Sequence, residues 1–299
     1  MTVPIITTKL HIPMQPKYLV PRSRLFGKFE DGKQGKLILV SAPAGFGKTS
    51  IIAEWVSQCK GESLVSWVHL DENDNALNRF LSYMVASIEA NQNGFGESAL
   101  SGLLASPPAP IDAILASLVN DIDSLDRESI LVLDDYHLIE APEIHNALSF
   151  LLEHLPSQMC LVVGTRTDPP LPLHRLRARG ELVEIRADDL RFSQEETELL
   201  LERLLNQQLP ASDIKALDSR VEGWAAGLQM AALSMQDRAD IHDFVESFSG
   251  SHRFIMDYLT EEIFNNQPGA IQEFLLLTSM LDRLCSPLCE TVLILSLIH

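Results

Sequence analysis

The most constraining feature of the sequence is one stretch, KLILVSAPAGFGKTSIIAE, at Lys36–Glu54. Lys36–Val40 is a short apolar run typical of a buried strand, Ala42–Gly47 is a turn of small residues, and Thr49–Val56 has apolar residues at helical spacing. A strand, a glycine-containing loop, Gly-Lys-Thr and a helix, in this order, form the context that identifies a phosphate-binding loop (P-loop). The stretch therefore predicts a βα unit with a phosphate site at its turn.

The residue types in this loop match the chemistry of phosphate binding. Backbone N–H groups in a loop of small residues can point at phosphate oxygens, and the helix N-terminus adds its positive dipole end. Lys48 is expected to reach the β- and γ-phosphates of a nucleotide, and Thr49 to offer its hydroxyl to Mg²⁺. The predicted nucleotide contacts are Ala42, Pro43, Ala44, Gly45, Phe46, Gly47, Lys48, Thr49 and Ser50.

The loop departs from the usual pattern at its first position, where Ala42 stands in place of glycine. Alanine fits there if the backbone keeps a negative φ. The alternative interpretation is a tight βα turn that only looks like a P-loop.

A second part of the site is predicted at Ser129–Tyr136, SILVLDDY, where an apolar run ends in Asp134 and Asp135. Such a run is typical of a buried parallel strand, and ligands of open α/β sheets bind at the carboxyl ends of the strands. One carboxylate there can hold the Mg²⁺ of a nucleotide, and the next can orient or deprotonate an attacking water. A strand that runs into a solvated acidic turn would have the same sequence; the upstream P-loop favours the functional interpretation.

Two further segments leave alternatives open. Arg166 follows the apolar run Cys160–Thr165, where a cation could meet a γ-phosphate or could instead pair with Asp168. Leu19–Arg22 is either a surface strap or a segment that lies against a nucleotide base.

Alternating strand and helix patterns as far as Leu182–Ile185 predict an α/β fold with a parallel sheet flanked by helices. Within it, Asn91–Pro110 is expected to be a loop-rich crossing because of its glycines and prolines. From Ser193 the pattern stays helical, and Ser193–Glu196 has the Ser-x-x-Glu capping box that starts a helix. The apolar ending Thr291–His299 has the look of an element cut short.

Composition excludes several classes of function. The chain has 41 acidic and 23 basic residues, a net charge of −18 that disfavours binding to a nucleic-acid backbone. Its four cysteines do not suggest a disulfide scaffold. No signal pattern opens the sequence, and no apolar run approaches the ~20 residues that span a bilayer. We therefore expect a soluble cytoplasmic protein that binds neither DNA nor membranes.

These motifs, in this order and over nearly the whole chain, resemble the N-terminal part of MalT-like, LuxR-type ATP-dependent transcription activators, which belong to the STAND class of signal-transducing P-loop ATPases. The segments that carry the resemblance are TTKLHIP at 7–13, LVPRSRL at 19–25, LILVSAPAGFGKTS at 37–50, VSWVHLDENDN at 65–75, LVLDDYHLI at 131–139, GTRTDPPLPLHRLRARGEL at 164–182, EGWAAGLQMAAL at 222–233 and SGSHRFIMDYLTEEIF at 249–264.

The resemblance implies a P-loop nucleotide-binding domain at 1–190, a small helical domain at 191–236 and a partial, truncated winged-helix-like domain at 237–299. In this family ADP is held in a closed resting monomer, and inducer with ATP opens it so that protomers self-associate. Family members continue into a helical-repeat sensor and a helix-turn-helix that binds DNA, and neither is found in these 299 residues. A fragment or truncated product without direct DNA binding is therefore expected.

The resemblance also assigns roles residue by residue. Thr49 and Asp134 match the Mg²⁺-linked pair, Asp135 the water-activating acid and Arg166 the sensor of the γ-phosphate. Val20 and Arg22 match the adenine-side segment. Gly223–Leu228 resembles the family's Gly-x-Pro region, which packs the helical domain on the nucleotide, although Ala225 and Ala226 stand where a proline is often found. His252 is either the histidine that senses ADP in related switches or a surface residue at a helix start.

The leading hypothesis is a switch that binds ATP or ADP with Mg²⁺ and hydrolyses ATP slowly, with different domain arrangements favoured by the two nucleotides. The alternatives are a P-loop kinase or transferase, a DNA-remodelling ATPase motor, and an inactive truncated remnant. The long helical tail argues against a kinase, and the acidic charge argues against a motor on DNA.

Overall fold

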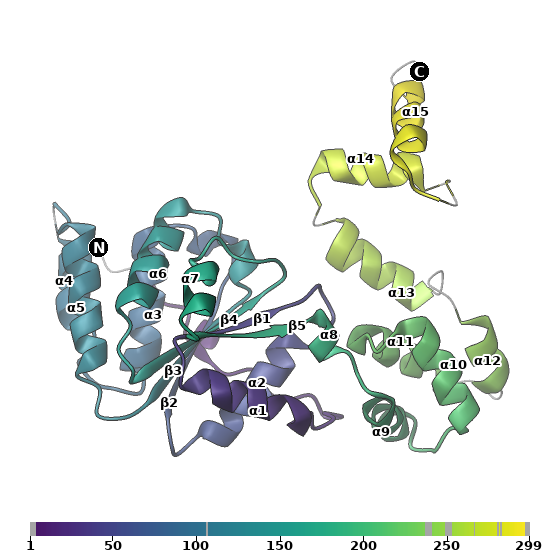
Figure 1. Ribbon diagram of the computed structural model, residues 1–299, viewed down its shortest axis with the longest axis horizontal. Helices are drawn as coiled ribbons and strands as arrows, with labels where there is room; N and C mark the ends of the chain where they lie inside the picture. The colour runs from purple at the N-terminus through teal and green to yellow at the C-terminus, as the bar shows by residue number, and fades with distance from the viewer. Residues whose placement is uncertain are drawn as a thin grey trace. The chain divides into compact units, whose positions relative to one another are not determined.

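The computed structural model describes residues 4–105, 107–236, 241–248, 253–265, 267–279, 281 and 283–296. The chain divides into two compact units, Met1–Gln229 and Met230–His299 (Figure 1). The predicted divisions at 190/191 and 236/237 stay predictions, and His252 and residues 237–240 lie outside the described residues.

A five-stranded, wholly parallel sheet forms the centre of the first unit and confirms the predicted α/β fold. The strand order is β2-β3-β4-β1-β5. The carboxyl ends of parallel strands meet at one edge, so the P-loop after β1 and the acids after β3 share that edge. The bounds are β1 Leu37–Ser41, β2 Leu64–His69, β3 Ser129–Asp134, β4 Met159–Thr165 and β5 Leu182–Arg186.

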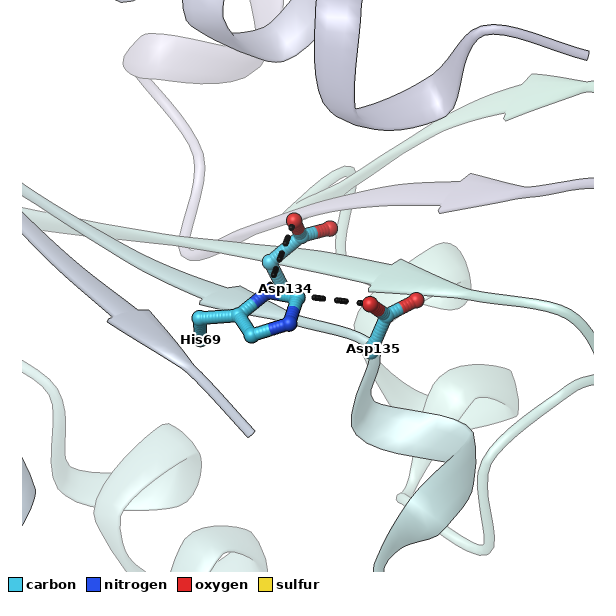
Figure 2. Close-up of side chains that lie close together, drawn as sticks. All are labelled: His69, Asp134 and Asp135. Carbon is cyan, nitrogen blue, oxygen red and sulfur yellow. Dashed lines mark ion pairs between the residues drawn. The ribbon is translucent and has the colours of Figure 1, made fainter. Parts of the chain in front are cut away.

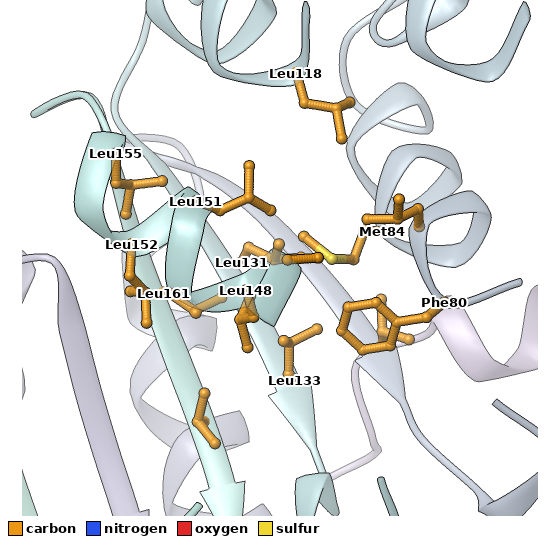
Figure 3. Packing of buried hydrophobic residues seen from close by; sticks show 14 of the residues in the cluster. Phe80, Met84, Leu118, Leu131, Leu133, Leu148, Leu151, Leu152, Leu155 and Leu161 are labelled. Atoms are coloured by element: carbon orange, nitrogen blue, oxygen red, sulfur yellow. The ribbon is translucent and has the colours of Figure 1, made fainter. Parts of the chain in front are cut away.

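Helices cover both faces of this sheet (Figure 1). In β1, Leu37 and Leu39 face one hydrophobic cluster while Ile38 and Val40 face the other, because side chains alternate along a strand. Figure 3 shows the first cluster, where leucines of β3 and β4 meet side chains of the covering helices. These helices are α3 Leu77–Glu89, α4 Glu97–Leu104, α5 Ile111–Asp123, α6 Pro142–His154 and α7 Leu173–Ala178.

The second face is covered by α1, Ser23–Lys33, and α2, Lys48–Cys59. Phe29 of α1 stacks on Trp55 of α2 with ring centroids 4.7 Å apart. Since both rings are fully or almost fully buried, this contact fixes α1 against the helix that starts at the P-loop.

One expected loop is wrong. The crossing at Asn91–Pro110 contains α4, which starts after Gly96 and packs through Ala99, Leu100 and Leu103 into the first cluster. Gly96, with φ 74°, directly precedes the first residue of α4, and Gly102 lies within α4. These glycines suggested a loop, but one of them caps a short helix and the other is part of it. Tertiary burial outweighs local propensity here.

Helices follow the sheet, as the change of sequence period predicted. The Ser193 capping box is confirmed: its Oγ accepts from the Glu196 N–H at 3.2 Å, and Glu196 Oε2 accepts from the Ser193 N–H at 3.0 Å. The helices of the first unit after β5 are α8 Ala187–Leu190, α9 Gln194–Leu205, α10 Ala211–Val221 and the start of α11, Ala225–Met235.

The secondary-structure elements described in the second unit are helices. After the end of α11 they form α12 Ile241–Ser247, α13 Arg253–Tyr258 with a π-helical continuation at Leu259–Phe264, α14 Gly269–Thr278 and α15 Ser286–Ser296. The apolar ending thus belongs to a helix as far as Ser296. Among the described helices, none combines the length and apolarity that a bilayer span requires.

Candidate functional site

The P-loop joins the end of β1 to the start of α2. Gly45 and Gly47 both have φ 77°, a conformation that favours glycine and turns successive N–H groups into a concave surface for an anion. Ala42 does not have a positive φ, so alanine fits this position without backbone strain. Its N–H donates to the Thr165 carbonyl at 3.2 Å, which ties the loop to β4.

Lys48 folds over this loop. Its Nζ donates to the carbonyls of Ala42 at 2.8 Å and Pro43 at 3.0 Å, and the side chain is buried. Burial lowers the pKa of Lys48; Asp135 opposes this shift and Arg166 adds to it. A cation desolvated beside another cation favours an anion as its neighbour, which is what a phosphate would provide.

Thr49 and Asp134 form a pair at the base of the loop. Thr49 Oγ1 lies 3.0 and 3.2 Å from the two carboxylate oxygens of Asp134, which is fully buried. Gly164 of β4 makes room for this carboxylate, since a Cβ there would lie 2.7 Å from Asp134 Oδ1. A hydroxyl and a carboxylate are oxygen ligands of the kind that Mg²⁺ takes in proteins.

Asp135 has φ 57° and begins the turn that leads into Tyr136–Leu138. Burial raises the pKa of Asp135, and the neighbouring Asp134 raises it further. A carboxylate with a raised pKa is a better proton acceptor for water than an ordinary one. His137 Nδ1 lies 3.8 Å from Asp135 Oδ1, and burial lowers the pKa of His137 to about 4, so this ring is neutral at pH 7.

His69 also belongs to this cluster, which the sequence did not reveal (Figure 2). Its Nδ1 lies 3.6 Å from Asp134 Oδ2 and 3.7 Å from Asp135 Oδ2, and Asp134 raises the pKa of the ring. His69 ends β2 and pairs in register with Asp134 of β3. No motif in the sequence marks His69; only the strand order, with β2 beside β3, brings it next to Asp134.

Arg166 follows β4 at the same edge of the sheet. Its charge lowers the pKa values of Lys48, Asp135 and His137, so it acts both on the P-loop lysine and on the residues that follow β3. Asp168, the alternative partner predicted for Arg166, forms an ion pair with Arg186, with Nη2 3.1 Å from Oδ2.

A cavity of about 220 Å³ opens beside the P-loop. Val20 and Arg22 line it and are almost fully buried, so a surface strap is wrong for these two residues, and their contact with a nucleotide base stays a prediction. The Arg22 guanidinium donates to the Arg191 carbonyl at 3.1 Å and lies over the Phe192 ring at 4.7 Å. Burial lowers the pKa of Arg22 to about 10. The lining also includes Gly47, Ser50, Glu54, Phe192, Leu200 and Gln229.

The segment Gly223–Leu228 touches the P-loop directly. Trp224 Nε1 donates to the Ala44 carbonyl at 3.1 Å, and the Ala226 N–H donates to the Gly45 carbonyl at 3.0 Å. The resemblance implied contact with a nucleotide for this segment; these bonds to the loop itself were not predicted.

The residues present fit a nucleotide and Mg²⁺. The loop provides two glycines with positive φ and a buried cation, Thr49 and Asp134 provide oxygen ligands, and the cavity has apolar and polar walls beside Gly47. Such a combination can bind a phosphate chain at the loop and a ring system in the cavity.

The sequence is similar to those of known transcriptional regulators. The chain is 34% identical over 281 residues to the HTH-type transcriptional regulator MalT of Klebsiella pneumoniae, covering 93% of this chain and 31% of that protein. It is 35% identical over 294 residues to MalT of Cronobacter sakazakii, covering 96% of this chain and 32% of that protein. The chain thus spans about a third of the length of these relatives.

The family model of the MalT winged helix domain matches residues 260–294. Among solved structures, a signal transduction ATPase with numerous domains (STAND) that carries a tetratricopeptide repeat sensor, from Pyrococcus horikoshii, is similar with a TM-score of 0.50 and 14% identity. This likeness covers 90% of this chain and 36% of that one and concerns the fold. Nearly the whole chain is therefore similar to about a third of the MalT transcriptional regulators, and its fold is similar to that of a signal transduction ATPase.

Proposed function

We propose that this chain is a switch that binds ATP or ADP with Mg²⁺ and hydrolyses ATP slowly, as the regulatory NTPase part of a MalT-like transcription regulator. The observation that carries the proposal is the Thr49–Asp134 pair at the base of a loop with two positive-φ glycines, beside a cavity walled by Val20 and Arg22. Phosphate, metal and base would thus each have residues of suitable chemistry within one site.

The site residues divide by role. Lys48 and the backbone N–H groups of Ala44–Ser50 bind the phosphates, while Thr49 and Asp134 hold the metal. Mg²⁺, when bound, neutralises phosphate charge. Asp135 orients the attacking water and accepts its proton, and Arg166 stabilises charge on the γ-phosphate.

The walls of the cavity support a switch. They come from the N-terminal segment, from α2, and from α9 and α11, which follow the sheet. A nucleotide in the cavity would contact all of them, so ATP and ADP can favour different arrangements if they contact these walls differently. We propose that self-association follows ATP binding in the full-length protein, and that DNA binding lies outside this acidic chain.

The decisive experiment is Asp135→Asn. Asparagine tolerates the left-handed backbone of position 135 and keeps the side-chain shape, so only the negative charge is lost. We expect ATP to bind at least as well, while single-turnover hydrolysis of radiolabelled ATP slows by roughly 10²-fold or more. Hydrolysis at the parent rate would remove Asp135 from the catalytic site.

Asp126→Asn is the matched control. It makes the same change on an exposed residue just before β3, at the opposite end of the strand from Asp135, and should leave hydrolysis unchanged. Conversion of ATP to ADP that requires an added acceptor molecule, with the phosphoryl group transferred to that acceptor, would favour a kinase over the switch.

A further inference from the structure

Two hydrogen bonds connect the P-loop to the start of α11, a part of the chain about 180 residues away. Their donors are the indole N–H of Trp224 and the backbone N–H of Ala226; their acceptors are the carbonyls of Ala44 and Gly45. The two accepting carbonyls belong to consecutive residues of the P-loop.

Holding these carbonyls also aims the neighbouring donors. In a trans peptide the C=O and the following N–H point in opposite directions. The bond to the Ala44 carbonyl therefore fixes the direction of the Gly45 N–H, and the bond to the Gly45 carbonyl fixes that of the Phe46 N–H. When these carbonyls are drawn towards α11, the two N–H groups are turned to the other side, where a P-loop needs them.

The position of the Trp224 ring is itself defined by close packing. A Cβ on Gly227 would lie 2.5 Å from Trp224 Cε3, so the ring lies directly on that glycine. The turn before it is anchored too: the Gly223 carbonyl accepts from the Phe192 N–H at 2.9 Å, and Gly223 has φ 68°. The indole N–H is thus presented to the loop in one orientation.

We propose that Trp224 is a positioning residue of the phosphate site, whose N–H, together with that of Ala226, holds the P-loop in its phosphate-binding conformation. The inference rests on the proposed nucleotide binding. Its consequence is reciprocal: if docking of the start of α11 strengthens phosphate binding, a bound phosphate chain strengthens that docking by the same factor.

The test is Trp224→Phe, which removes the N–H and keeps an aromatic ring on Gly227. We expect the dissociation constant of ADP, measured by isothermal titration calorimetry, to rise about 2- to 13-fold, the range for losing one hydrogen bond. Adenosine has no phosphate, so its affinity should not change. Replacing Trp224 by benzothienylalanine, which keeps the bicyclic shape without an N–H, should have the same effect.

Trp55→Phe is the matched control, because Trp55 Nε1 donates to Glu30 Oε1 at 2.7 Å and its ring packs on Phe29 instead of the P-loop. It should leave ADP affinity at the parent value. Unchanged ADP binding by Trp224→Phe, or an equal loss for adenosine and ADP, would overturn the inference while the proposed function stands. A parent protein that binds neither ADP nor ATP would overturn both.

Discussion

Gly164→Ala changes the candidate metal pair without touching either of its members. Gly164 lies in β4, and no positive φ prevents alanine there, so the backbone itself accepts the change. The obstacle is space: the added Cβ would lie 2.7 Å from Asp134 Oδ1 and 3.3 Å from Ile52 Cδ1.

The size of the effect follows from these distances. An ordinary carbon–oxygen contact needs about 3.4 Å, so the Asp134 carboxylate must retreat by roughly 0.7 Å. Because Asp134 is fully buried, it has no solvent to swing into, and its 3.0 and 3.2 Å contacts with Thr49 would lengthen beyond hydrogen-bond range. Losing a hydrogen bond to a charged group costs about 1.5–3 kcal/mol, or roughly a tenfold to hundredfold change in affinity.

We therefore expect Gly164→Ala to reduce, by about tenfold to hundredfold, the gain in ADP affinity that Mg²⁺ provides. Calorimetric titration of ADP with Mg²⁺ and with EDTA measures this gain, and the EDTA value should stay near that of the parent. Gly27→Ala is the matched control, because an added Cβ in α1 meets no atom within 4 Å. An unchanged Mg²⁺ gain in Gly164→Ala would refute the assignment of Asp134 to the metal.

Two further predictions concern charge. Lys48→Ala removes a cation from the proposed phosphate site and a brace from the carbonyls of Ala42 and Pro43, so calorimetry should show ATP and ADP both weakened, by on the order of 2–4 kcal/mol. Burial lowers the pKa of His145, so below pH 6.5 the unfolded chain binds a proton that the folded protein does not. Urea unfolding below pH 6.5 should therefore show that the free energy of unfolding decreases as the pH is lowered, by at most ~1.4 kcal/mol per pH unit. His145→Gln should reduce this slope.

Much of the fold could be predicted because its signals are local. The P-loop stretch, the apolar run before Asp134 and the Ser193 capping box each lie within about twenty residues, and the observed elements agree with them to within a few positions. The strand order could not be read in this way, because it depends on pairing between distant segments. His69 shows the difference: it joins Asp134 only because β2 lies beside β3.

The same limit applies to the contacts that support the site. The space for Asp134 depends on Gly164 in another strand, and the hydrogen bond from Trp224 to Ala44 joins residues that are 180 positions apart in the sequence. Neither leaves a pattern in the sequence, since each depends on how packed elements meet. The helix α4 was missed for a related reason, because its burial is tertiary while its glycines are local.

The position of β1 in the sheet has a consequence for biosynthesis. This strand is fully buried and is made early, but its two neighbours, β4 and β5, follow only after more than a hundred further residues, with Leu37 paired to Leu161 and Leu182. At ~5–20 residues per second, a ribosome needs roughly 7–30 s to supply the last partner. During that interval the apolar segment LILVS has no native strand partner in the nascent chain. The proposed phosphate site is thus completed late in translation, and the unpaired β1 is exposed to aggregation before then.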